Sequence, residues 1–64
     1  MNNAQPEPLN ALAYQIKLAI VEANIILAES KDSTAKITAA ETLADLQRAL
    51  AILEAKIRSR QNSL

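Results

Sequence analysis

The sequence predicts an all-α protein: an antiparallel hairpin of two helices that self-associates into a four-helix bundle or a higher helical oligomer. Heptad-spaced apolar residues fill two stretches of the 64-residue chain, and one short polar break separates them. The first stretch carries two apolar faces, whereas the second carries one strong seam, and this mismatch predicts association. The chain is expected to form a single domain, near the lower size limit for independent folding.

The first helix is expected over about residues 8–30, after a polar leader, residues 1–7, that we expect to be mobile. Pro8 suits the first helical position, because its ring presets φ and its missing N–H has no partner there. The alternative start is a cap by Asn10. Beyond these residues no Gly or Pro interrupts the stretch before Ser30, and its Ala, Leu, Glu and Lys residues favour a helix.

Polar residues of this first helix recur at heptad spacing along two lines on roughly opposite sides of the helix. One line consists of Asn10, Lys17, Asn24 and Lys31, and the other of Gln15, Glu22 and Glu29. Two apolar faces lie between these lines. The first face, expected to form the intrachain core, consists of Leu9, Leu12, Ile16, Ala19, Ile20, Ala23, Ile26 and Leu27. The second face, expected to form an oligomer or partner interface, consists of Tyr14, Leu18, Val21, Ile25 and Ala28.

The second helix is expected over about residues 34–60, after a turn at residues 31–33 in which Asp32 or Ser33 caps its N-terminus. So short a turn forces the two helices to be antiparallel. The second helix contributes one seam at alternating spacings of four and three residues: Ala39, Leu43, Leu46, Leu50, Leu53 and Ile57. Residues 61–64 are expected to form a frayed tail.

The register of the hairpin does not by itself decide which face of the first helix meets this seam. Folding at the turn sets Ile20 opposite Leu46, but it equally allows Leu18 there. The first face is preferred because it alone extends to Leu9, which would meet Ile57. The second face then stays in water unless another chain covers it, and such a stripe exceeds what a monomer usually exposes. A two-fold dimer is the simplest outcome.

Composition excludes most chemical functions. The chain has no Cys, no His and no Gly, so it offers no thiolate or imidazole ligand, no nucleophile paired with a His base, and no Gly-rich phosphate loop. We therefore expect no catalytic, cofactor-binding or metal-binding residues, no small-molecule substrate, and no enzymatic activity.

The favoured function is protein–protein association, as a homo-oligomeric regulator or adaptor. The layout resembles the dimeric helical hairpins that bind RNA to regulate plasmid copy number, and that resemblance implies an RNA-binding regulator as one alternative. Its candidate phosphate contacts are Arg48, Lys56, Arg58 and Arg60. The zero net charge and the single aromatic residue, Tyr14, disfavour nucleic acid as a partner.

A second alternative follows from a layout similar to the small helical co-chaperones of bacterial type III secretion, which implies a hairpin that covers the apolar helix of a partner. In both cases the resemblance is one of layout and no sequence motif carries it.

A cytoplasmic, soluble protein is expected. No basic segment precedes an apolar run in the manner of a signal peptide. The apolar stretch is interrupted by four polar residues that would be costly inside a membrane, which are Gln15, Lys17, Glu22 and Asn24.

Overall fold

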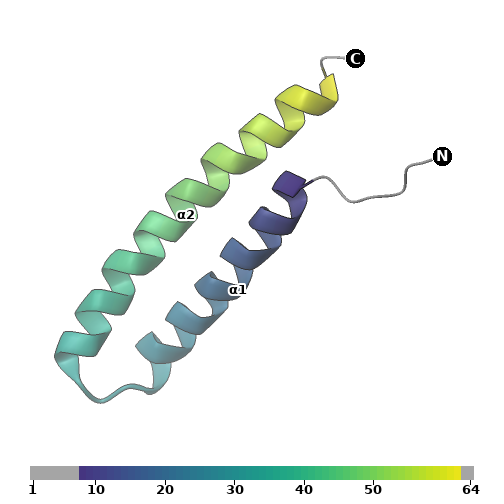
Figure 1. Cartoon of the computed structure of the whole chain (residues 1–64). Coiled ribbons are helices and arrows are strands. Elements are labelled where there is room, and N and C mark those ends of the chain that lie inside the picture. Colours follow the sequence, from purple (N-terminus) through teal and green to yellow (C-terminus); the bar gives the residue numbers. More distant parts are fainter. Residues whose placement is uncertain (1–7, 63–64) are drawn as a thin grey trace.

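The computed structural model describes residues 8–62, which form two helices joined by a short turn. Helix α1 spans Pro8–Glu29 and helix α2 spans Ser33–Asn62. The two helices run antiparallel and lie side by side, and α2 extends past the start of α1 (Figure 1). The predicted all-α hairpin is confirmed, whereas its self-association stays a prediction.

Helix α1 begins at Pro8, as expected, and the other three helix ends differ from the expected ones by one or two residues. Gln61 and Asn62 were expected to fray, but both are helical. The basic side chain of Arg60 lies in this last turn, where positive charge offsets the helix dipole. The expected leader, residues 1–7, and the last two residues of the expected tail, 63–64, lie outside the described residues.

Asp32 caps α2, which settles the choice between Asp32 and Ser33. Its carboxylate oxygen Oδ1 accepts a hydrogen bond of 3.0 Å from the backbone N–H of Thr34, and its carbonyl accepts one of 3.0 Å from Lys36. Both bonds satisfy N–H groups that the first turn of a helix leaves without partners.

The end of α1 shows how a chain without glycine makes this turn. The N–H of Ser30 continues the helical pattern by donating to the carbonyl of Ile26 at 2.9 Å. The hydroxyl of Ser30 then accepts a hydrogen bond of 3.2 Å from the N–H of Asp32. No residue from 8 to 62 has a positive φ, so α1 ends without the left-handed residue that commonly follows a helix.

The face of α1 that carries Leu9 packs against α2. Its residues at alternating spacings of four and three are buried or half-buried, and we call them the inner face: Leu9, Ala13, Ile16, Ile20, Ala23 and Leu27. Opposite them lies the seam of α2, also buried or half-buried: Ala39, Leu43, Leu46, Leu50, Leu53 and Ile57. Two matching heptad seams therefore form the contact between the helices.

Leu12 corrects the expected intrachain core. Its side chain is 48% exposed, although it was assigned to the face that packs on α2. The reason is geometric, since Leu12 is displaced by about 60° around the helix from Leu9, whereas Ala13 is displaced by about 40° to the other side. Ala13 is 6% exposed and takes the position at the contact. Ile26 was placed on the same face and is also exposed, at 43%.

The core between the helices is thin. Within residues 8–62 the buried side chains are Ala13, Ala23, Ala39 and Leu53, and none of these is fully enclosed. Three of the four are alanines, which contribute little apolar area, and a core of this size gives a chain of 64 residues marginal stability at best. The hairpin therefore has much to gain from burying more apolar surface.

Candidate functional site

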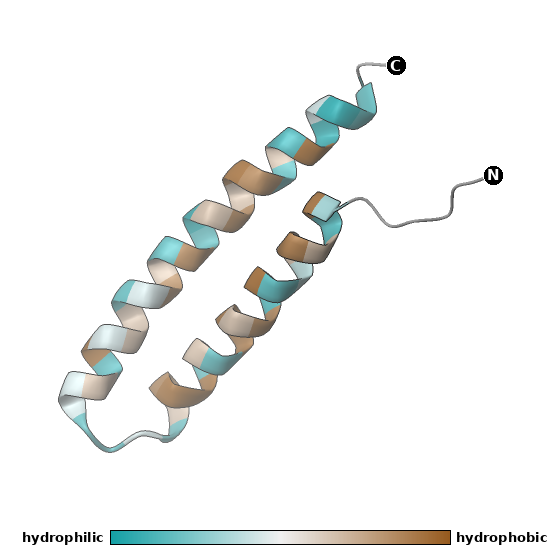
Figure 2. Cartoon of the chain, viewed as in Figure 1, coloured by the Kyte–Doolittle hydropathy of each residue, from teal (hydrophilic) through white to brown (hydrophobic). Residues whose placement is uncertain are grey.

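The most extensive apolar surface lies on α1, on the side away from α2. We call Tyr14, Leu18, Val21, Ile25 and Ala28 the outer face, and all five are exposed. The four large residues have exposed fractions of 61% for Tyr14, 44% for Leu18, 53% for Val21 and 47% for Ile25. Apolar segments recur along the whole of α1 in Figure 2, whereas the C-terminal end of α2 is mostly hydrophilic.

The outer face is bordered by the two polar lines of α1. Lys17 and its heptad neighbours border one edge, and Glu22 and its neighbours border the other. An apolar strip between two polar edges is the arrangement of a helix that packs against another helix. The structure thus keeps together, on one side of one helix, the five residues expected to form an interface.

A shallow apolar groove of about 530 Å³ runs between the helices near the turn. Four residues of α1 line it, one of them charged: Ala19, Glu22, Ala23 and Ile26. On α2 it is lined by Leu46 and by four small residues: Ala35, Thr38, Ala39 and Thr42. The small side chains leave space there, so the groove widens the apolar surface of α1 toward the side that carries Ile26 and Leu12. Sequence reasoning missed it because alanine and threonine do not stand out in a hydrophobic pattern.

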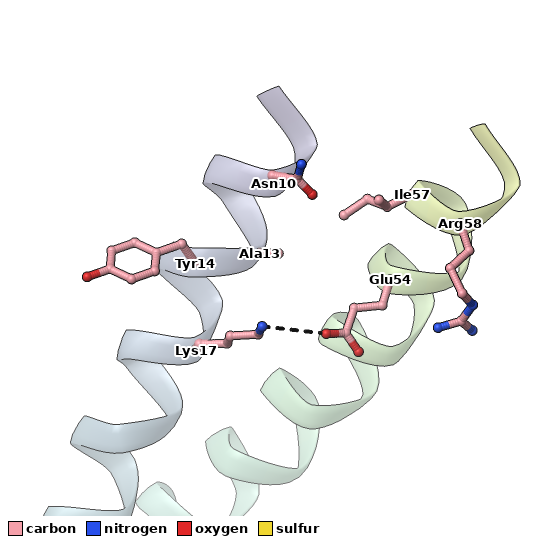
Figure 3. Close-up of a pocket in the computed structure, with 7 residues that line it drawn as sticks. All are labelled: Asn10, Ala13, Tyr14, Lys17, Glu54, Ile57 and Arg58. Atoms are coloured by element: carbon pink, nitrogen blue, oxygen red, sulfur yellow. Dashed lines mark ion pairs between the residues drawn. The ribbon is translucent and has the colours of Figure 1, made fainter. Parts of the chain in front are cut away.

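A second groove, of about 460 Å³, lies near the open end of the hairpin and contains polar groups (Figure 3). Lys17 on α1 and Glu54 on α2 point toward one another across it, with 3.7 Å between Nζ and Oε2. Both side chains are partly exposed, at 57% and 42%, so water weakens the pair. Tyr14 lines this groove, but its ring points away from α2 toward the outer face.

These two grooves show which parts of the two helices lie near one another. Ala13 shares one groove with Glu54 and Ile57, whereas Ala23 shares the other with Ala39. The pairing of Ile20 with Leu46, expected from folding at the turn, stays a prediction.

The candidate phosphate contacts do not share one side of α2. Arg48 hydrogen-bonds to Asp45 at 3.4 Å, and its charge is thereby partly offset. Lys56 and Arg58 are two residues apart, so they project from α2 in nearly opposite directions. Arg60 is one helical turn beyond Lys56 and projects from the same side as Lys56. Arg60 also interacts with other groups of the chain. The described part of α2 thus presents separate cations rather than a basic patch.

The exposed side of α2 carries two isolated large residues, Ile37 at 60% and Ile52 at 52% exposed. Between them lie small or charged side chains, so no continuous apolar strip forms there. Single exposed aliphatics are common on protein surfaces and do not mark an interface.

Residues 8–62 include no group of three or more Asp or Glu side chains close enough to hold a metal ion. The hydroxyl groups of Ser30 and Ser33 lie at the turn, where the Ser30 hydroxyl accepts a backbone hydrogen bond. The chain has no His and no Cys, so it contains no nucleophile–base pair that uses either residue.

Helix α1 is long and apolar enough to cross a membrane if length and composition are the only criteria. It has 22 residues, and the mean hydropathy of its most apolar window is 1.5. The core helix of a soluble protein can meet the same criteria, and so can a signal sequence near the N-terminus.

Comparison of the chain with protein-family models, with curated proteins and with solved structures finds no match.

Proposed function

We propose that this protein acts without catalysis, by protein–protein association through the outer face of α1, as a homo-oligomeric regulator or adaptor. The observation that carries the proposal is the strip of four large side chains on that face, each 44–61% exposed, on a hairpin whose core contains one buried leucine.

The magnitude of this exposure supports association. Full burial of a large apolar side chain is worth about 1.5–3 kcal/mol, so covering the exposed half of four of them is worth about 3–6 kcal/mol per chain. Two chains would gain twice that amount, which is comparable to the estimated cost of about 4–15 kcal/mol for bringing two molecules together. The extra burial also stabilises a hairpin that has little core of its own.

The location proposed with this function is the cytoplasm. On an insertion scale, the nine large aliphatics of α1 would favour a membrane by about 3–5 kcal/mol in total. Lys17 lies near the middle of the helix and costs about 2.5–3.5 kcal/mol there, and Glu22 adds a comparable cost. The two charges offset the aliphatics, so a protein partner suits α1 better than lipid.

The test is the molar mass of the purified chain by size-exclusion chromatography with light scattering. We expect a dimer or a higher oligomer for the natural sequence and a monomer for a double variant, Leu18→Asp with Ile25→Asp. The matched control is Ala44→Asp with Ala51→Asp, which places the same two charges at exposed positions of α2 and should leave the oligomer intact.

Other results would redirect the proposal. A natural chain that is a soluble monomer at concentrations of about 100 µM would contradict self-association. Binding of structured RNA to that monomer would favour an RNA-binding regulator, and co-purification with one helical protein would favour a co-chaperone. Recovery of the chain in the membrane fraction would contradict the cytoplasmic location.

A further inference from the structure

We propose that the partner on the outer face is a second copy of this chain, packed in parallel and in register, so that the α1 helices of the two copies run in the same direction. The inference rests on the proposed association and adds its orientation. The apolar residues of the outer face fit either direction, whereas the charges at its edges fit one.

The apolar residues of the outer face form a heptad seam that continues to Ala11, which is also exposed. A parallel pair stacks each seam residue on its own copy, such as Leu18 on Leu18 of the second copy. An antiparallel pair instead stacks Leu18 on Val21 and Tyr14 on Ile25. Both arrangements fill the seam with layers of similar size, so packing does not choose between them.

The two edges of the seam differ in charge. In a parallel pair, a residue on one edge faces the residue five positions later on the opposite edge of the other helix. Lys17 then faces Glu22 of the second copy, and the two-fold axis repeats this ion pair. The same offset sets Asn24 opposite Glu29, which joins an amide donor to a carboxylate.

An antiparallel pair brings each edge against its own copy. With Leu18 on Val21, the nearest edge residues to Glu22 are Gln15 and Glu22 of the second chain, and those nearest Lys17 are Asn24 and Lys17 of the second chain. An antiparallel pair therefore lacks the two ion pairs between Lys17 and Glu22 that a parallel pair has, and this difference favours the parallel direction. The helix dipoles do not reverse the preference, because each α1 already has an antiparallel α2 beside it.

Lys17 is well placed for such a contact. It lies between the inner face and the outer face, its side chain is 57% exposed, and its contact with Glu54 is a long one at 3.7 Å. The flexible side chain of Lys17 can therefore carry its ammonium group from Glu54 to a carboxylate of a second chain, while the backbone position of Lys17 stays the same.

Disulfide trapping tests the direction, and the natural chain has no cysteine to interfere. Ala11→Cys and Ala28→Cys are suitable because both sites are exposed seam positions and the exchange removes no large side chain. The two sites are 17 residues apart on α1, which is about 25 Å. A disulfide requires Cα atoms within about 7 Å, so the two arrangements cannot give the same products.

A parallel pair predicts that each single-cysteine variant forms a covalent dimer on mild oxidation. In a second experiment, one of the two variants carries a tag and both are oxidised together. A parallel pair then predicts no enrichment of the mixed disulfide, which joins position 11 of one chain to position 28 of the other. Ala44→Cys on the exposed side of α2 is the control for random collision and should crosslink slowly. A mixed product with little self-crosslinking would overturn the parallel direction and leave the association intact. A monomer by light scattering would overturn both.

The charges are tested separately by reversing them. Lys17→Glu should weaken the association about threefold to tenfold, because two attractive contacts become repulsive. Adding Glu22→Lys to the same chain should restore the affinity to within about twofold, although the contact with Glu54 stays disrupted. Equal weakening in the single and double variants would show that Lys17 acts only through Glu54, and would overturn the proposed ion pair.

Discussion

Leu53 is expected to be the most sensitive large residue of the hairpin, and Leu12 provides its matched control. Leu53 is 8% exposed and lies on the seam of α2. The next residue, Glu54, lines a groove together with the small Ala13 of α1. Leu53→Ala removes a buried side chain whose small neighbour cannot fill the space. Leucine-to-alanine changes in protein cores cost about 2–5 kcal/mol, and we expect about 2–3 kcal/mol here, because water can enter a core only one layer thick.

Leu12→Ala is expected to cost less than about 1 kcal/mol. Its side chain is 48% exposed, so about half of its transfer free energy is absent from the start, and no closed cavity forms. Alanine also has a slightly higher helix propensity than leucine. The same chemical change therefore separates a seam residue from a surface residue.

Urea unfolding followed by circular dichroism at 222 nm measures both changes. All variants are compared at one protein concentration, because the proposed association would contribute to stability. We compare the urea concentration at the midpoint of unfolding, and the dependence of the unfolding free energy on urea, for three chains: the natural sequence, Leu53→Ala and Leu12→Ala. A cost for Leu12→Ala equal to or above that for Leu53→Ala would refute the packing described here and would return Leu12 to the intrachain core.

Two further changes probe the turn and the ion pair between the helices. Asp32→Ala removes the cap of α2 and should lower the free energy of unfolding by about 1 kcal/mol, whereas Asp45→Ala, which only breaks an exposed contact with Arg48, should cost less than about 0.5 kcal/mol. Equal costs in urea unfolding would contradict the capping role of Asp32. Glu54→Gln should cost less than about 1 kcal/mol and lose its effect in 0.5 M NaCl, because Glu54 and Lys17 are both partly exposed. A larger cost that persists in salt would mean that the pair is more strongly shielded from water than its exposure indicates.

The fold was predictable because each of its causes is local in sequence. The polar break, expected at residues 31–33 and found at 30–32, the cap at Asp32 and the heptad seam that contains Leu53 depend on residue type and spacing alone. These features determine two antiparallel helices and one face of α2.

The rotation of α1 was less predictable, because it depends on which side chains are small enough to let the helices approach. Ala13 lies on the alternating four-and-three spacing from Leu9 and occupies the contact. Leu12 was assigned to the core in its place because its side chain is larger. The contact between Lys17 and Glu54 follows from that rotation, so neither helix alone could reveal it. A partner for the outer face is a proposal, and the only information that one chain gives about it is the pattern of charges at the edges of that face.

The shortness of the turn gives the chain a second way to associate. Helical hydrogen bonds reach Ser30 on one side and begin again from the carbonyl of Asp32 on the other, so Ser30–Asp32 are the residues that keep α1 and α2 from being one rod of about 80 Å. If these residues became helical, two opened chains could exchange their second helices and rebuild every contact of the hairpin between molecules. Such a domain-swapped dimer needs no interface beyond the one already present. The carboxylate of Asp32 therefore does more than cap the start of α2, because it also favours the form in which each chain covers its own inner face.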